Sequence, residues 1–136
     1  LTRYFIKTAL VYLALSLTLG AVLAARPALA LPDEVAAFSP VFFHLFMVGW
    51  VTQLIFGMLF WMLPKYSKEL PRGHEKVAWA AYWLINGGLV LRVLGEPLTA
   101  LRPEWGLGWL LGVSALLQLG GGWAFIVSAW PRVRVR

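Results

Sequence analysis

The chain of 136 residues contains no cysteine. Disulfide bonds, thiolate metal sites and cysteine nucleophiles are therefore excluded. Charged residues are scarce as well, because they make up 13% of the chain, whereas soluble domains carry about a quarter. Hydrophobic residues make up 60% of the sequence, and the mean hydropathy is +0.74. The composition therefore indicates an integral membrane protein.

Catalytic motifs are also missing. The sequence shows no nucleotide-binding loop, no nucleophile–base pair and no carboxylate pair, and it holds only two histidines, His44 and His74. The net charge of +6 comes from basic residues at the ends of apolar runs, which indicates membrane topology rather than a nucleic-acid partner. The residues alone leave open whether the protein is an enzyme, and they favour a non-catalytic role.

Four apolar segments are long enough, or nearly so, to cross a bilayer core of about 30 Å, which takes roughly 20 helical residues. They run from about Tyr4 to Ala25, Val41 to Leu63, Val77 to Leu94 and Trp105 to Trp130. Proline, glycine and charged residues lie between them, including Glu96-Pro97 at the start of the third loop. We therefore predict an all-α, four-helix transmembrane bundle forming a single membrane domain over residues 1–136.

Basic residues predict the orientation of this bundle. Nine of the twelve cations lie before or at the start of the first span, between the second and third, or after the fourth. They are Arg3, Lys7, Lys65, Lys68, Arg72, Lys76, Arg132, Arg134 and Arg136. The positive-inside rule places both termini in the cytoplasm of a multi-pass protein, which we expect in a bacterial inner membrane. The basic tail Arg132 to Arg136 is interpreted as a topology anchor that also contacts anionic lipid.

The N-terminal segment has a second interpretation. Arg3 and Lys7, an apolar run and then Ala28-Leu29-Ala30 are also typical of a secretory signal with its cleavage site. The apolar run is long for a signal, so we expect a retained helix.

The second span carries a histidine, His44, near the end that we predict to be outer. At 100° per residue, one helical face holds His44, Met47, Val51, Ile55, Met58 and Met62. Gly49, Gln53 and Gly57 fall on the opposite face, which predicts a close-packing seam with one polar contact. Glycines of the later spans, at positions 87–88, 108, 112 and 120–122, predict further close packing.

His44 has two interpretations. A neutral imidazole among apolar side chains is a common axial ligand of haem iron, with Met47 and Val51 as neighbours of the cofactor. The alternative is a histidine that hydrogen-bonds a carbonyl group or water near the interface. Arg92 is expected at a similar depth in the third span, where it would meet a haem propionate. Its alternatives are snorkelling to the surface or an i,i+4 pair with Glu96.

The segment from His44 to Val51, followed by Gly57 to Lys65 (GMLFWMLPK), resembles the second helix of haem–copper oxidase subunit I. Similar family members are the nitric oxide reductase large subunit, the C-family oxidases and the NnrS family. The resemblance is good for the second span, loose for the third and absent from the first and fourth. It implies that His44 ligates a low-spin haem. Such oxidases need further histidines for a dinuclear centre. This chain has only one histidine besides His44, and that residue, His74, falls in the predicted cytoplasmic loop.

The predicted function is therefore haem b binding, with His44 ligating the iron, in electron transfer or the handling of nitric oxide or another diatomic gas during respiration. A second His44 from a homodimer could supply the sixth ligand, or the iron could keep an open site. Copper(I) held by histidine and methionine is a weaker prediction. The alternatives are a haem-free accessory subunit of a respiratory complex, and a quinone-reactive or transport protein using Arg92, Gln53, Gln118 and Asn86.

Overall fold

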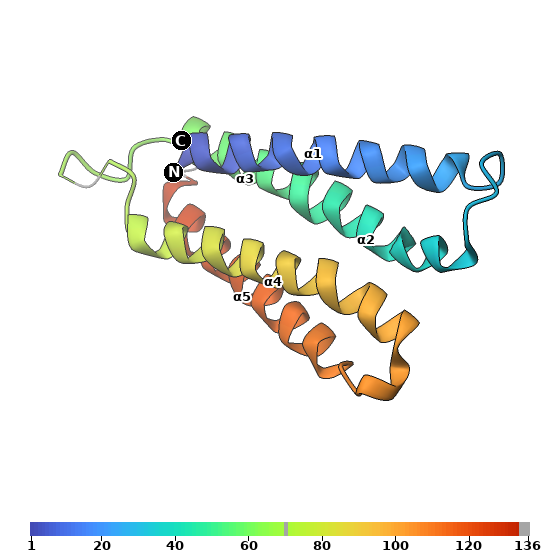
Figure 1. Ribbon diagram of the computed structural model, residues 1–136. Helices are drawn as coiled ribbons and strands as arrows, with labels where there is room; N and C mark the ends of the chain where they lie inside the picture. The colour runs from blue at the N-terminus through green and yellow to red at the C-terminus, as the bar shows by residue number, and fades with distance from the viewer. Residues whose placement is uncertain (70, 134–136) are drawn as a thin grey trace.

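The computed structural model describes residues 1–69 and 71–133, which form helices joined by short loops with no strand among them (Figure 1). The α-helices are α1 (Thr2–Ala25), α2 (Ser39–His44), α3 (Gln53–Met62), α4 (Glu75–Leu101) and α5 (Trp109–Ala129). Short 3-10 segments cover Asp33–Phe38, Pro103–Trp105 and Trp130–Arg132, and a π-helical segment covers Leu45–Thr52. The prediction of an all-α fold is therefore confirmed.

Four helical stretches of the described chain are long and apolar enough to cross a membrane. They cover Thr2–Ala25, Asp33–Met62, Glu75–Leu101 and Trp109–Arg132. Large apolar side chains are exposed along all four, as a bundle surrounded by lipid requires. The ends of the first and fourth stretches differ from the predicted ends by at most a few residues. The second stretch ends as predicted but begins earlier, because the 3-10 segment Asp33–Phe38 precedes it.

The loops alternate between the two ends of the bundle (Figure 1). Residues 63–69 and 71–74 lie at the same end as the start of α1 and the end of α5, whereas residues 26–38 and 102–108 lie at the opposite end. The start of α1 and the end of α5 therefore lie at one end of the bundle, and that both termini face the same side of a membrane stays a prediction. Which side is the cytoplasm stays a prediction, and Arg134 and Arg136 lie outside the described residues.

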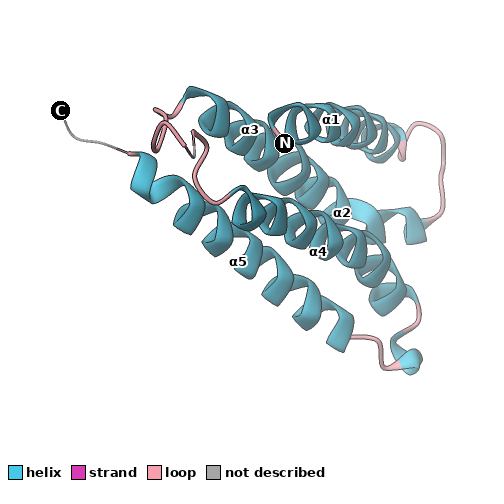
Figure 2. Ribbon diagram, turned by 90° about the vertical axis from the view of Figure 1, so that its left-hand side faces the viewer, coloured by secondary structure: helices cyan, strands magenta, loops and turns pink. Residues whose placement is uncertain are grey.

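Helices α4 and α5 pack through small residues, as Figure 2 shows for their long side-by-side course. An added Cβ at Gly88 would lie 2.9 Å from the Ser114 carbonyl oxygen, and one at Gly121 would lie 2.5 Å from Ile85 Cγ1. The Ser114 hydroxyl donates to the Gly88 carbonyl at 2.7 Å. The prediction of close packing is confirmed at Gly88 and Gly121. It is wrong for the glycines beside which a Cβ would meet nothing within 4 Å, namely Gly87, Gly108, Gly112 and Gly122.

The predicted packing seam of the second span is confirmed. Gly49 and Gly57 both approach α1 closely. A Cβ added at Gly49 would lie 2.7 Å from the Tyr12 side chain, and one added at Gly57 would lie 3.0 Å from Phe5 Cβ. Between them Gln53 is fully buried and forms a reciprocal amide pair with Asn86 of α4, at 3.1 and 3.2 Å. The Tyr12 hydroxyl also donates to Asn86 Oδ1, so three helices share one polar contact.

Arg132 closes the end of the bundle at which α3 and α5 finish. Its side chain is buried and donates to the carbonyl oxygens of Phe60, Leu63 and Pro64 at 2.8–3.1 Å. The last carbonyls of a helix have no partner within the helix, so a guanidinium is well suited to cap them. Arg132 thus caps the end of α3, and its role as a topology anchor that contacts anionic lipid stays a prediction.

The third span is longer than predicted. Helix α4 continues through Pro97, which is buried inside it, and ends only at Leu101. Glu96 therefore lies in the helix rather than in a loop. A proline lacks the N–H that the helix would use there, but a neighbouring helix and local backbone adjustment let such a residue persist in a membrane helix.

Candidate functional site

The structure brings His44 of α2 against Glu96 of α4. The distance from His44 Nδ1 to Glu96 Oε1 is 3.0 Å, and the same nitrogen lies 2.9 Å from the carbonyl oxygen of Pro40, one turn earlier. The Glu96 side chain is 8% exposed and the His44 side chain 29%. The imidazole is therefore held at the edge of the bundle by an almost fully buried carboxylate.

The two neighbours of Nδ1 determine the tautomer of His44. A carbonyl oxygen and an ionised carboxylate oxygen can only accept hydrogen bonds. Nδ1 must therefore carry the proton and donate it. In the neutral imidazole this arrangement leaves the lone pair on Nε2, the atom that points away from both partners.

Arg92 completes the cluster. Its Nη1 lies 3.7 Å from Glu96 Oε1, in the i,i+4 arrangement, and its side chain is 17% exposed. His44 and Arg92 both approach Glu96 Oε1, so a carboxylate that was expected in a loop lies between them. Arg92 Nε and Glu96 Oε2 are buried without a hydrogen-bond partner in the described chain. Whether Arg92 also meets a propionate stays a prediction.

The π-helical segment, which begins directly after His44, turns this histidine toward α4. A π-helix needs roughly one residue more per turn than an α-helix. Over eight residues, its accumulated rotation about the helix axis is therefore about two fifths of a turn smaller than that of an α-helix. His44 and Gln53, which a regular helix would place on opposite faces, therefore both bond to α4. The Thr52 hydroxyl, which donates to the Met47 carbonyl five residues back, matches this wider turn.

The same twist changes the predicted neighbours of His44. Met47 is 53% exposed, Met58 and Met62 are exposed too, and Val51 is half-buried. The face that carries the methionines is open surface rather than the wall of a pocket around the imidazole. That Met47 and Val51 contact a cofactor stays a prediction.

Other polar residues of the spans are used in packing. Gln53 and Asn86 satisfy each other, and Gln118 Nε2 donates to Ser114 Oγ at 3.1 Å within α5. His74 lies at the other end of the bundle, before α4, and is exposed. No group of three or more His, Asp or Glu side chains that could hold a metal ion is found in residues 1–69 and 71–133. Of the two histidines, only His44 lies within a span.

Glu96 was not predicted to contact His44. Because Pro97 follows it, the segment was expected to leave the helix. The i,i+4 pair of Arg92 with Glu96, one of the two alternatives given for Arg92, is confirmed, and it forms because the helix continues.

Comparisons with known proteins add no assignment: no protein-family model, no curated protein and no solved structure matches the chain.

Proposed function

We propose that this chain is a multi-pass membrane protein that binds haem b, with His44 Nε2 as an axial ligand of the iron. One observation carries the proposal. His44 Nδ1 donates to the Pro40 carbonyl and to Glu96, and histidines that bind metals commonly donate their other N–H to a carboxylate or carbonyl group. The likeness of this span to the second helix of haem–copper oxidase subunit I supports the same role.

The residues around His44 are compatible with haem at an outer-facing surface of the bundle. The imidazole is part-exposed, and its helix neighbours Phe43 and Met47 are 62% and 53% exposed, so the Nε2 side is accessible to a flat apolar group. A second copy of this chain or another subunit would cover the other face of that group. We therefore propose a homodimer or a larger respiratory complex as the functional unit.

Each residue of the cluster has a defined task in this proposal. Glu96 accepts a hydrogen bond from the Nδ1–H of His44. This bond fixes the orientation of the ring and increases the basicity of the imidazole. Arg92 balances the buried carboxylate charge and keeps Nε free for a propionate. When bound, haem supplies one-electron transfer and a position at which a diatomic gas can bind. A role in electron transfer or gas handling in a bacterial inner membrane follows.

A haem-free accessory subunit is the second candidate. One observation favours it: Glu96 already engages both His44 and Arg92, so the three side chains can serve as a latch between α2 and α4 without a cofactor. The quinone-reactive or transport alternative has less support, since Gln53, Asn86 and Gln118 are engaged in packing contacts.

The test is the absorption spectrum of the purified protein, oxidised and reduced with dithionite, beside His44→Ala. We expect a Soret band in the wild type that the variant lacks. His74→Ala is the matched control and should keep the band. The reduced α-band and the addition of nitric oxide then distinguish six-coordinate iron from an open site. A wild type that stays colourless after reconstitution with haemin would overturn the proposal and leave the accessory subunit.

A further inference from the structure

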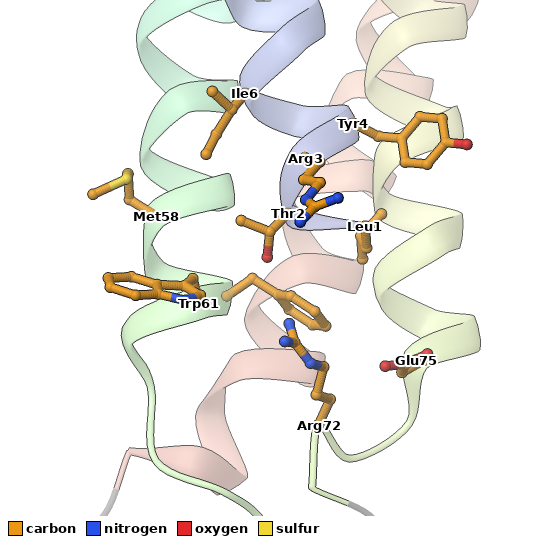
Figure 3. Close-up of a pocket in the computed structure, with 10 residues that line it drawn as sticks. Leu1, Thr2, Arg3, Tyr4, Ile6, Met58, Trp61, Arg72 and Glu75 are labelled. Carbon is orange, nitrogen blue, oxygen red and sulfur yellow. The ribbon is translucent and has the colours of Figure 1, made fainter.

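A pocket of about 570 Å³ lies between the start of α1, the end of α3 and the loop that leads to α4. Its wall includes Thr2, Arg3, Ile6, Met58, Trp61 and Arg72, and we call it the arginine pocket. Figure 3 shows Arg72 reaching from the loop toward Thr2 and Arg3 of α1, with Met58 and Trp61 on the opposite wall. The pocket is at the end of the bundle where most basic residues gather, away from His44.

Two guanidinium groups line this pocket without a carboxylate partner. Within residues 1–69 and 71–133, neither Arg3 nor Arg72 forms an ion pair, although Glu75 also lines the wall. The Thr2 hydroxyl is buried without a hydrogen-bond partner. Guanidinium and hydroxyl groups together donate the hydrogen bonds that a phosphate group accepts. The polar part of the pocket therefore suits an anion.

Arg72 is held in place by an aromatic ring. Its guanidinium carbon lies 5.5 Å from the centroid of Phe60, and that of Arg132 lies 5.1 Å from the same centroid. The Arg132 guanidinium is bonded to the carbonyls at the end of α3. The partial negative charge on free carbonyls at a helix C-terminus repels anions. Because Arg132 is bonded to these carbonyls, this repulsion is reduced near the pocket.

The remaining wall is apolar and continuous with the exposed surface of the bundle. Ile6 and Met58 line the pocket on the side of the spans, and Trp61 is 65% exposed at its rim. Tryptophan is enriched at the level of lipid headgroups. An occupant with a phosphate at one end and hydrocarbon at the other matches both parts of the wall.

We propose that the arginine pocket binds the phosphodiester headgroup of an anionic phospholipid, with Arg3 and Arg72 on the phosphate and the acyl chains along Ile6 and Met58. This site is separate from the His44 cluster and does not depend on haem binding. It requires only that the four helices lie in a bilayer. Anionic lipid is abundant at cytoplasmic membrane surfaces, which is the side to which the basic loops are assigned.

The test is native mass spectrometry of the detergent-purified full chain with equimolar phosphatidylglycerol and phosphatidylcholine. We expect phosphatidylglycerol to be retained in preference. In the double variant Arg3→Gln/Arg72→Gln the preference should fall by roughly fivefold for each arginine lost. The double variant Arg26→Gln/Arg102→Gln, which loses the same charge at the other end of the bundle, should keep the preference.

A second readout keeps the test independent of folding. Phosphatidylglycerol brominated on its acyl chains should quench a component of tryptophan fluorescence that Trp61→Phe removes. Equal loss of preference in both double variants would indicate a net-charge effect and overturn the site. Displacement of the lipid by millimolar inorganic phosphate would show that the pocket takes free phosphate rather than a headgroup, and would overturn the lipid assignment.

Discussion

Glu96 is the residue on which the chemistry of His44 depends. A carboxylate that is 8% exposed is costly in an apolar environment unless charged or hydrogen-bonding partners surround it. Here Arg92 and the Nδ1 proton of His44 supply those partners, at 3.7 and 3.0 Å. The three side chains form one electrostatic unit, so a change at Glu96 should affect both of the others.

We predict that Glu96→Gln weakens haem binding by about tenfold or more, because the uncharged amide is a poorer acceptor for Nδ1–H. Haem titration of the apoprotein measures this change. Glu104→Gln is the matched control, since Glu104 pairs with Arg102 at 3.7 Å on the exposed surface. Equal haem affinity in Glu96→Gln and wild type would contradict the task assigned to Glu96. If the wild type binds no haem and Glu96→Gln lowers only the melting temperature, the result would favour the second candidate, in which the three side chains hold α2 against α4.

At the scale of elements, the sequence predicted the helices well and their irregularities poorly. Apolar runs identified all four spans, and the spacing of Gly49, Gln53 and Gly57 identified the packing seam. The π-helical segment at Leu45–Thr52 could not be predicted, because its residues are typical of any apolar helix. Pro97 was misjudged for a related reason, since contacts in the bundle outweigh its local cost to the helix.

The interface of α4 and α5 yields a paired prediction on two adjacent glycines. Gly121→Ala would place a methyl group 2.5 Å from Ile85 Cγ1 and 3.0 Å from the Ile85 backbone nitrogen, so the helices must separate. We expect a loss of about 1–3 kcal/mol in the free energy of unfolding. Gly122→Ala meets nothing within 4 Å and should be neutral or slightly stabilising, because alanine favours helix. Thermal unfolding in detergent compares them, and equal melting temperatures would contradict the packing described for Gly121.

At the scale of the whole molecule, the two ends of the bundle differ. At one end the loop 63–74, the start of α1 and the end of α5 come together around the Arg132 cap, with basic residues around them. At the other end α1 and α5 diverge (Figure 1), and the His44 cluster lies between α2 and α4. The two proposals therefore concern opposite ends of the bundle, with the lipid site at the first end and the haem ligand at the second.

The absence of cysteine makes the topology directly measurable. We predict that Lys68→Cys reacts with a membrane-impermeant maleimide only after the cells are opened, because its loop carries the basic residues that remain in the cytoplasm. Leu29→Cys, in the exposed loop at the other end, should react in intact spheroplasts. The reverse labelling pattern would place the His44 cluster on the cytoplasmic side.

The Arg132 cap also imposes an order on biogenesis. Helices α1 and α3 can insert and pair as soon as they leave the ribosome, yet the carbonyls of Phe60, Leu63 and Pro64 receive their guanidinium partner only after residue 132 has been synthesised. Until then water or lipid headgroups must satisfy those carbonyls. The contact between the first hairpin and α5 therefore forms late, and a nascent chain arrested before residue 132 would lack it.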